Sequence, residues 1–298
     1  MSAPAGRPLP PHAPPGGPLG VLQVPRRPAG ARHHQLFAAP GPQVPVPVGV
    51  TDFVAHETVP RELHHRLGGE LQTLRLDGGV RGVMTAYPHD SRQVADMLKR
   101  AMKGAQPRIV NLMNPGDGGI DQSYIDKMPE GRTCRIGPLR VRKTTIGQED
   151  IGSNGHGGRI QHVRTRLMVR DEKSPNREWR AVDHHAFNGW IDTTELPPET
   201  FGRMWRSLYE PGRTDQGVMH CAGGVGRTPT LLWRLIFQQH LDSARRRNVH
   251  LSPAHRATFL HDLTAEARMM RGPQVLPDEG QLRMLYASCL RAVPYRQA

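Results

Sequence analysis

A cysteine and an arginine stand six positions apart in the segment 218–228, which reads Val-Met-His-Cys-Ala-Gly-Gly-Val-Gly-Arg-Thr. A free thiol has a pKa of about 8.5, so it is a weak nucleophile at neutral pH unless a positive environment holds it as thiolate. A strand ending at His220 and a helix beginning at Thr228 would place Cys221 beside a helix N-terminus, where several backbone N–H groups converge on one anion. The segment therefore predicts a loop that binds a phosphate group and presents a nucleophilic sulfur to it.

The other residues of this segment suit the same chemistry. Arg227 carries a planar guanidinium that can pair with two phosphate oxygens, and the Thr228 hydroxyl is close enough in sequence to hydrogen-bond the sulfur. Glycines let the backbone curl closely around a ligand. The alternative interpretation is an ordinary strand-to-helix turn around a buried cysteine. We expect the phosphate to be bound by the residues that follow the cysteine, which are Ala222, Gly223, Gly224, Val225, Gly226, Arg227 and Thr228.

The run 220–228 matches without a gap the signature of the cysteine-based protein tyrosine phosphatases, and the chain resembles that superfamily. The resemblance implies that Cys221 attacks phosphorus while the loop amides and Arg227 bind the phosphoryl oxygens. It also implies that His220 orients the cysteine loop without taking up a proton. An aspartate on a Trp-Pro-Asp loop should then protonate the leaving oxygen.

A candidate for that acid loop lies upstream at 187–193, which reads Phe-Asn-Gly-Trp-Ile-Asp-Thr, with Ile191 in place of the usual proline. By resemblance Asp192 is the general acid and Trp190 supports the loop. The alternative is a surface acid at a turn. No metal ion and no cofactor are needed for this chemistry, because Arg227 and the loop amides meet the charge of the transition state.

The resemblance also implies a residue that positions the hydrolytic water. Tyrosine phosphatases use a glutamine on a loop before the final helix, often followed by a second glutamine. Here Pro277 aligns with the first glutamine and Gln281 with the second. Proline has no side-chain donor or acceptor, so we expect Gln281 to position the water, with Gln274 as the alternative.

The resemblance implies an α/β fold in which a twisted mixed sheet is flanked by helices. More loosely, residues 70–292 resemble the type III-secreted bacterial effector tyrosine phosphatases of the Yersinia outer-protein type, through segments such as 83–88, 108–112 and 136–141. Apolar periodicity predicts helices over 91–104, 199–209, 230–241 and 253–270, and a last one from 278. Short strands are predicted over 107–113, 163–170 and 179–185.

Composition separates a tail from a domain. Residues 1–48 are rich in proline, glycine, alanine and arginine and have no helical or strand period, so we expect disorder there. The segment 8–11, Pro-Leu-Pro-Pro, could form polyproline II and bind a proline-recognising partner. The catalytic domain is predicted to span 49–298.

The chain carries a net charge of +13, which raises the question of nucleic-acid binding. Its arginines are scattered and no basic stripe interleaved with aromatic residues is evident, so nucleic acid is not favoured as a partner. We read the charge as attraction toward acidic substrates or surfaces. The histidine pairs 64–65 and 184–185 lack the spacing of a metal site.

No apolar run approaches the length of a membrane span, and residues 1–8 lack the apolar core of a signal peptide. Three cysteines cannot all pair, and one is the expected nucleophile, so a reducing compartment fits best. We therefore expect a cytoplasmic protein, or one secreted without a cleavable signal peptide and, by resemblance, delivered into a host cell as a virulence effector.

The expected function is hydrolysis of phosphotyrosine in proteins through a phosphocysteine intermediate. Some inositol-directed relatives carry lysines where this loop has Ala222 and Val225, which favours phosphotyrosine. An inositol polyphosphate phosphatase of the phytase kind remains an alternative, since other such enzymes also lack those lysines. A third possibility is a noncatalytic phosphate-binding module, because Ile191 departs from the acid-loop pattern.

Overall fold

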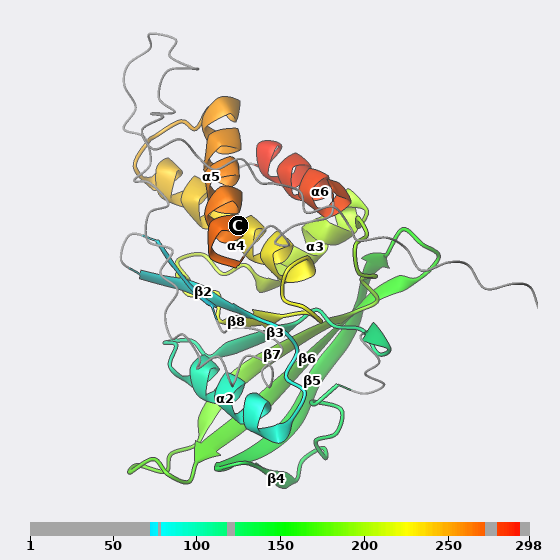
Figure 1. Cartoon of the computed structure of the whole chain (residues 1–298), viewed down its shortest axis with the longest axis vertical. Coiled ribbons are helices and arrows are strands. Elements are labelled where there is room, and N and C mark those ends of the chain that lie inside the picture. The colour runs from blue at the N-terminus through cyan, green and yellow to red at the C-terminus, as the bar shows by residue number, and fades with distance from the viewer. Residues whose placement is uncertain (1–71, 77–78, 118–122, 272–278, 293–298) are drawn as a thin grey trace, which may run out of the picture. The chain divides into compact units, whose positions relative to one another are not determined.

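The computed structural model of the chain describes residues 72–76, 79–117, 123–271 and 279–292 (Figure 1). These residues all belong to one compact unit, 44–298. The expected tail, 1–48, lies outside the described residues, so its disorder and its boundary with the catalytic domain stay predictions.

A single mixed sheet of eight strands organises the described part of the chain, in the order β1-β2-β8-β3-β7-β6-β5-β4. The pairs β2–β8, β8–β3 and β3–β7 are parallel, and the outer pairs are antiparallel. This confirms the expected mixed sheet. The strands are β1 (Gln72–Leu76), β2 (Gly79–Thr85), β3 (Arg108–Asn111), β4 (Thr133–Ile136), β5 (Leu139–Ser153), β6 (Arg159–Asp171), β7 (Arg180–Asn188) and β8 (Val218–His220).

Helices cover both faces of this sheet (Figure 1). On one face lies α2 (Ser91–Met102), whose Leu98 belongs to a core with Leu167 of β6. On the other lie four helices, whose Trp233 and Leu285 share a core with Phe187 of β7. These are α3 (Pro198–Leu208), α4 (Arg227–Arg246), α5 (Pro253–Arg271) and α6 (Glu279–Leu290). No helix in the described ranges combines the length and apolarity required to cross a bilayer.

Local sequence explains where the helix α2 begins. Asp90 is the residue before the helix, and its Oδ1 accepts hydrogen bonds from the amides of Arg92 at 2.9 Å and Gln93 at 2.8 Å. These bonds satisfy two amides that have no partner inside the helix. The helix predicted over 91–104 is confirmed, apart from its last two residues.

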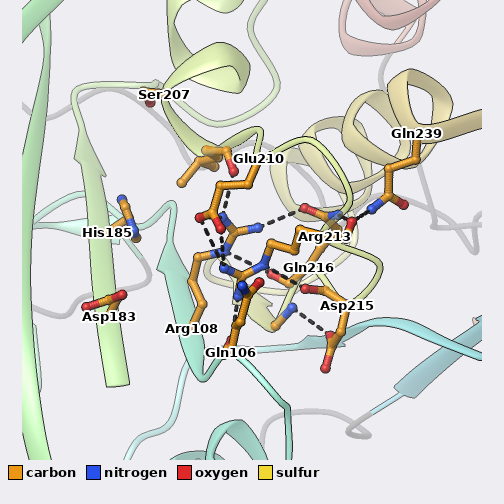
Figure 2. Close-up of polar contacts among 12 residues, drawn as sticks. Gln106, Arg108, Asp183, His185, Ser207, Glu210, Arg213, Asp215, Gln216 and Gln239 are labelled. Atoms are coloured by element: carbon orange, nitrogen blue, oxygen red, sulfur yellow. Dashed lines mark hydrogen bonds and ion pairs between the residues drawn. The ribbon is translucent and has the colours of Figure 1, made fainter. Parts of the chain in front are cut away.

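A buried arginine joins three segments at the edge of the sheet where β3 begins (Figure 2). Arg108 donates hydrogen bonds to the Leu208 carbonyl at 2.6 Å, and to the carbonyl and Oε1 of Gln216 at 3.3 and 2.8 Å. Burial lowers the pKa of Arg108 to about 9, so its guanidinium remains charged at neutral pH. The contacts fix the end of α3 and the start of β8 against β3.

The parallel strands place the predicted site residues at the opposite edge. His220, the last residue of β8, pairs with Thr85 of β2 and Asn111 of β3. The strand β7 runs parallel to β3 and ends at Asn188, within the segment 187–193 predicted as the acid loop. Because the carboxyl ends of parallel strands share one edge, the cysteine loop and the acid loop meet there.

Candidate active site

Cys221 lies between the strand β8 and the helix α4, as the sequence predicts. Only 2% of its surface is exposed, and its Sγ accepts a hydrogen bond from the Gly224 amide at 3.2 Å. Gly226 is the residue before α4. The helix begins at Arg227, one residue before the start at Thr228 that the loop predicts and three before the start at 230 that apolar periodicity predicts. The loop thus curls back so that one of its own amides faces the sulfur.

Glycine is required where the loop touches its neighbours. Gly224 has φ +70°, and a β-carbon there would lie 2.4 Å from the Thr85 carbonyl oxygen. A β-carbon on Gly226 would lie 2.9 Å from Oε1 of Gln281. A side chain at position 224 would push the loop off the β2 backbone, whereas one at position 226 would force the end of the Gln281 side chain to move. At Gly223 a β-carbon would have its nearest neighbour at 3.5 Å, so space around that position does not demand glycine.

Arg227 is fully buried and is held along one edge of its guanidinium. Its Nη1 donates to Oδ2 of Asp117 at 2.7 Å and to the Trp190 carbonyl at 2.9 Å. Its Nε lies 3.2 Å from Oδ1 of Asp192, without the geometry of a hydrogen bond. Among the described residues, Nε and Nη2 have no hydrogen-bond acceptor, and these two N–H groups form the fork that a phosphate can take.

The acid loop brings Asp192 to this arginine although Ile191 replaces the expected proline. The indole of Trp190 is buried, and its Nε1 donates to the Thr194 carbonyl at 3.0 Å. Thr193 has φ +61°, an uncommon conformation for a residue with a branched side chain. The Asp192 side chain is half exposed, so its carboxyl can reach both solvent and a bound ester.

Gly189 lies within the acid loop and allows it to approach β6 closely. It has φ +105°, and a β-carbon there would lie 2.1 Å from the Arg159 carbonyl oxygen. Asn114 bridges the acid loop to the segment after β3, accepting from the Gly189 amide at 2.5 Å and donating to the Trp190 carbonyl at 2.6 Å. Hydrogen bonds at Gly189 and Trp190 therefore hold the acid loop against the segment that follows β3.

Sequence reasoning missed Asp117, which the structure places against the buried arginine. Its Oδ2 also accepts from the Asn114 amide at 2.9 Å, and its side chain is 18% exposed. The signal that could have found it is an acid in a Pro-Gly-Asp turn at the carboxyl end of a buried strand. Such a carboxylate can orient the guanidinium while its other edge stays available.

His220 is buried beneath the cysteine loop in a row with two side chains that the sequence analysis did not connect to it. The Tyr124 hydroxyl lies 3.2 Å from Nε2 of His220 and 3.2 Å from Nε2 of His184. Burial lowers the pKa of both imidazoles to about 3. Both are therefore neutral at physiological pH, which agrees with an orienting role for His220; that role stays a prediction.

Gln281 reaches the site from the helix α6. Its side chain is fully buried, and its Oε1 and the Oδ1 of Asp192 lie 2.9 and 3.7 Å from the position of a Gly226 β-carbon. The two side chains thus approach the loop at one point. Gln274, the alternative, lies outside the described residues.

The geometry differs from one expectation about the cysteine loop. The Thr228 hydroxyl is buried but makes no hydrogen bond to the sulfur or to another described residue, so the expected contact is wrong for this arrangement. Within the described ranges, no three His, Cys, Asp or Glu side chains are arranged to hold a metal ion.

Solved structures of known proteins share the fold of this chain. No protein-family model matches the chain, and no curated protein matches it by sequence. Among solved structures, the catalytic domain of human protein tyrosine phosphatase non-receptor type 18 has a TM-score of 0.53 at 17% identity, covering 74% of this chain and 73% of that one. The same phosphatase bound to a HER2 phosphopeptide has a TM-score of 0.55 at 17% identity, covering 74% and 75%.

A second phosphatase, TbPTP1 of Trypanosoma brucei, has a TM-score of 0.53 at 18% identity and covers 75% of this chain and 73% of that one. The chain therefore has the α/β fold of protein tyrosine phosphatase catalytic domains, as the sequence analysis expected. The narrower resemblance to secreted bacterial effectors stays a prediction.

Proposed function

We propose that the chain is a protein tyrosine phosphatase that hydrolyses phosphotyrosine through a phosphocysteine intermediate. The observation that carries this proposal is that three groups meet at the cysteine loop. They are the buried Cys221, the available N–H fork of Arg227 and the carboxyl group of Asp192, which comes from the acid loop. Asp192 lies 3.2 Å from the arginine that would hold the phosphate, so acid and phosphate would be neighbours.

In the first step the Cys221 thiolate attacks phosphorus and the bond from phosphorus to the ester oxygen breaks. Asp192 donates a proton to that oxygen, so tyrosine leaves as a neutral phenol. The Arg227 fork and the loop amides bind the three remaining oxygens and stabilise their charge in the transition state. Asp117 holds the arginine from the other edge at 2.7 Å.

In the second step water attacks phosphorus and the bond from phosphorus to sulfur breaks, which regenerates the thiolate and releases phosphate. Asp192, now a carboxylate, takes the proton from water. Gln281 is the residue assigned to position that water, and its contact with the loop at Gly226 supports the assignment.

The substrate class rests on the loop and on a structural neighbour. Ala222 and Val225 put no cation beside the phosphate, whereas a polyphosphorylated inositol would bring several further anionic groups to the loop. The neighbour with the HER2 phosphopeptide binds a phosphorylated peptide with the same fold. An inositol polyphosphate phosphatase is the second candidate, favoured by the net charge of +13.

A noncatalytic phosphate-binding module is the third candidate. It was raised because Ile191 departs from the acid-loop pattern, yet Asp192 stands beside Arg227 and Trp190 packs as a support would. These contacts favour a working acid. Export, delivery into a host cell and recognition of the proline-rich segment by a partner stay predictions.

Phosphate release from a phosphotyrosine peptide and from inositol hexakisphosphate, measured side by side with Cys221→Ser as the control, tests the proposal. We expect turnover of the peptide, little turnover of the inositol phosphate and none by the variant. Turnover of the inositol phosphate alone would establish the second candidate, and no turnover of either would support the third.

A further inference from the structure

Six arginines share one face of the sheet, away from the active site. Register places them together, since paired residues of antiparallel strands lie on the same face. Arg135 of β4 pairs with Arg140 of β5, which pairs with Arg170 of β6. The arginine face, as we name it, consists of Arg135, Arg140, Arg142, Arg164, Arg166 and Arg170.

Away from the active site this face is open to solvent. Side chains alternate between faces along a strand, and Leu167 and Val169 of β6 are buried in the core with α2. The neighbouring Arg166 and Arg170 therefore point to the opposite face. Near the active site that opposite face is buried at Ile160, in the core with α3 to α6. Farther along β6 it is exposed, and the Arg166 side chain has 52% of its surface in solvent.

The arrangement is unfavourable for the isolated protein. Like charges directly opposite one another across strands destabilise a sheet, and Arg135, Arg140 and Arg170 form such a row. Glu172 lies 3.8 Å from Arg140 and 2.8 Å from Arg170. Asp183 lies 3.1 Å from Arg166. Glu172 and Asp183 are thus the carboxylates that form ion pairs with this group, and in the described part of the chain Arg135, Arg142 and Arg164 have no acidic partner. Glu149 lies on the same face but pairs with His162.

One aromatic ring accompanies these charges. Trp179 stands directly before β7, with the guanidinium carbons of Arg142 and Arg170 at 5.7 and 5.1 Å from its ring centroid. Its side chain is exposed. Surfaces for single-stranded nucleic acid stack successive bases on several aromatic rings, and the paired rows of this face carry no second Trp, Phe or Tyr. A membrane surface would need more exposed apolar side chains.

We infer that the arginine face is a docking site for an extended acidic segment of the phosphoprotein substrate. Same-side residues in an extended chain repeat about every 7 Å, which is also the spacing of arginines two positions apart on a strand. Guanidinium and carboxylate groups pair with geometric specificity. Trp179 offers an apolar contact at the end of the row.

The geometry also sets the distance between this docking site and the phosphotyrosine. Gly189, at the acid loop, packs against the Arg159 backbone at the start of β6. Arg166 lies seven residues farther along β6, or about 23 Å away. The acidic segment should therefore lie roughly seven or more residues from the phosphotyrosine. The effect of this segment on turnover rests on the proposed function, whereas its binding to the arginine face does not.

The test uses the full chain and a labelled peptide of about twelve glutamates without phosphate, long enough to cross the face. The triple variant Arg135→Thr, Arg142→Thr, Arg164→Thr removes three arginines and keeps residues that favour strands. The matched control, Arg245→Gln, Arg246→Gln, Arg247→Gln, removes the same charge from the exposed end of α4. Binding is measured by fluorescence anisotropy at about 50 mM salt, where screening is weak.

We expect the sheet variant to bind the peptide at least about tenfold more weakly, and the α4 variant to bind like wild type. Equal weakening by both variants would mean attraction by net charge alone and would overturn the inference. So would no binding by wild type, or tighter binding of an oligouridylate of equal charge.

Two further measurements protect the result. If the sheet variant unfolds, quenching of tryptophan fluorescence by acrylamide in the wild type tests the inference instead. Trp179 is exposed whereas Trp190, Trp205 and Trp233 are buried, so a bound peptide should reduce the quenching. No reduction would overturn the inference. A phosphotyrosine peptide with a distant glutamate tract should show a higher kcat/KM than one without it, only when the arginines are present. If the sheet variant loses this difference in kcat/KM but still turns over the peptide without the tract, the docking site is separate from the proposed chemistry.

Discussion

The Asp117 carboxylate and the Arg227 guanidinium form an ion pair at 2.7 Å across the segment after β3 and the first residue of α4. The pair holds one edge of a fully buried arginine. Without it, the Trp190 carbonyl would be the one hydrogen-bond partner left to Arg227 among the described residues. The orientation of the phosphate-binding fork thus depends on a residue outside the signature segment.

Replacing Asp117 by Asn should lower kcat/KM for an aryl phosphate by about tenfold or more, because a charge-assisted hydrogen bond is worth roughly 1.5–3 kcal/mol. Affinity for vanadate should fall with it, since both ligands use the same fork. The exposed Asp262 on α5 provides the control, Asp262→Asn. Unchanged vanadate affinity in the Asp117 variant would contradict the orienting role.

The buried imidazoles should make stability depend on pH. Burial lowers the pKa of His184 and His220 to about 3, so between pH 6.5 and 3 the unfolded chain binds protons that the folded chain does not. Stability is therefore fully present above about pH 6.5 and is lost as pH falls, by about 2 kcal/mol per histidine at pH 5.

Urea unfolding at pH 7 and pH 5 measures this loss. His184→Gln should reduce the difference between the two pH values, whatever it does to stability at pH 7, and the exposed His261→Gln should not. An identical pH dependence in His184→Gln and wild type would show that this imidazole titrates normally.

How much of this site could be predicted depended on how local its determinants are. The place of the cysteine loop between a strand and a helix could be predicted, because Cys221 and Arg227 lie in one short segment whose glycines and flanking elements define it. The hydrogen bond expected of Thr228 could not be predicted, because it depends on side-chain geometry. Asp192 was found because its loop keeps a Trp-x-Asp pattern. Asp117, Tyr124 and His184 were missed, because each meets the site through contacts between residues far apart in the chain.

The same reasoning applies to the fold. Most of β5 gave no periodic signal, since its middle residues are largely exposed and polar; its pairing with β6 along its length makes it a strand. The short segment 154–158 joins β5 to β6. The helix predicted over 230–241 is longer at both ends, Arg227–Arg246. Buried residues extend from Arg227 to Ala244, beyond the apolar period that the prediction used.

Asp192 should also shape the pH profile. The leaving phenolate has a conjugate acid with a pKa near 10, so it needs a proton in order to leave. The rate should therefore fall at high pH, where Asp192 has lost the proton that it donates. Asp192→Asn should slow turnover by about a hundredfold or more and flatten that limb. A variant with the wild-type rate and limb would mean that another residue is the acid.

Gln281 should act in the second step. If this residue alone positions water, hydrolysis of the phosphocysteine limits turnover, and rapid mixing should show a burst of phenol near one equivalent per site. Gln281→Ala should lower the steady-state rate more than the burst rate. No burst in wild type, with the variant indistinguishable from it, would point to Gln274 or to another group.

The phosphocysteine itself is the central claim, and acid quenching within the first turnover tests it most directly. Wild type mixed with excess aryl phosphate, quenched and digested, should yield the peptide containing Cys221 with one added phosphoryl group on sulfur, as mass spectrometry can show. Cys221→Ser should retain substrate binding but yield no phosphorylated peptide and no turnover. Rapid hydrolysis by Cys221→Ser, or a phosphoryl group on a residue other than Cys221, would contradict the account.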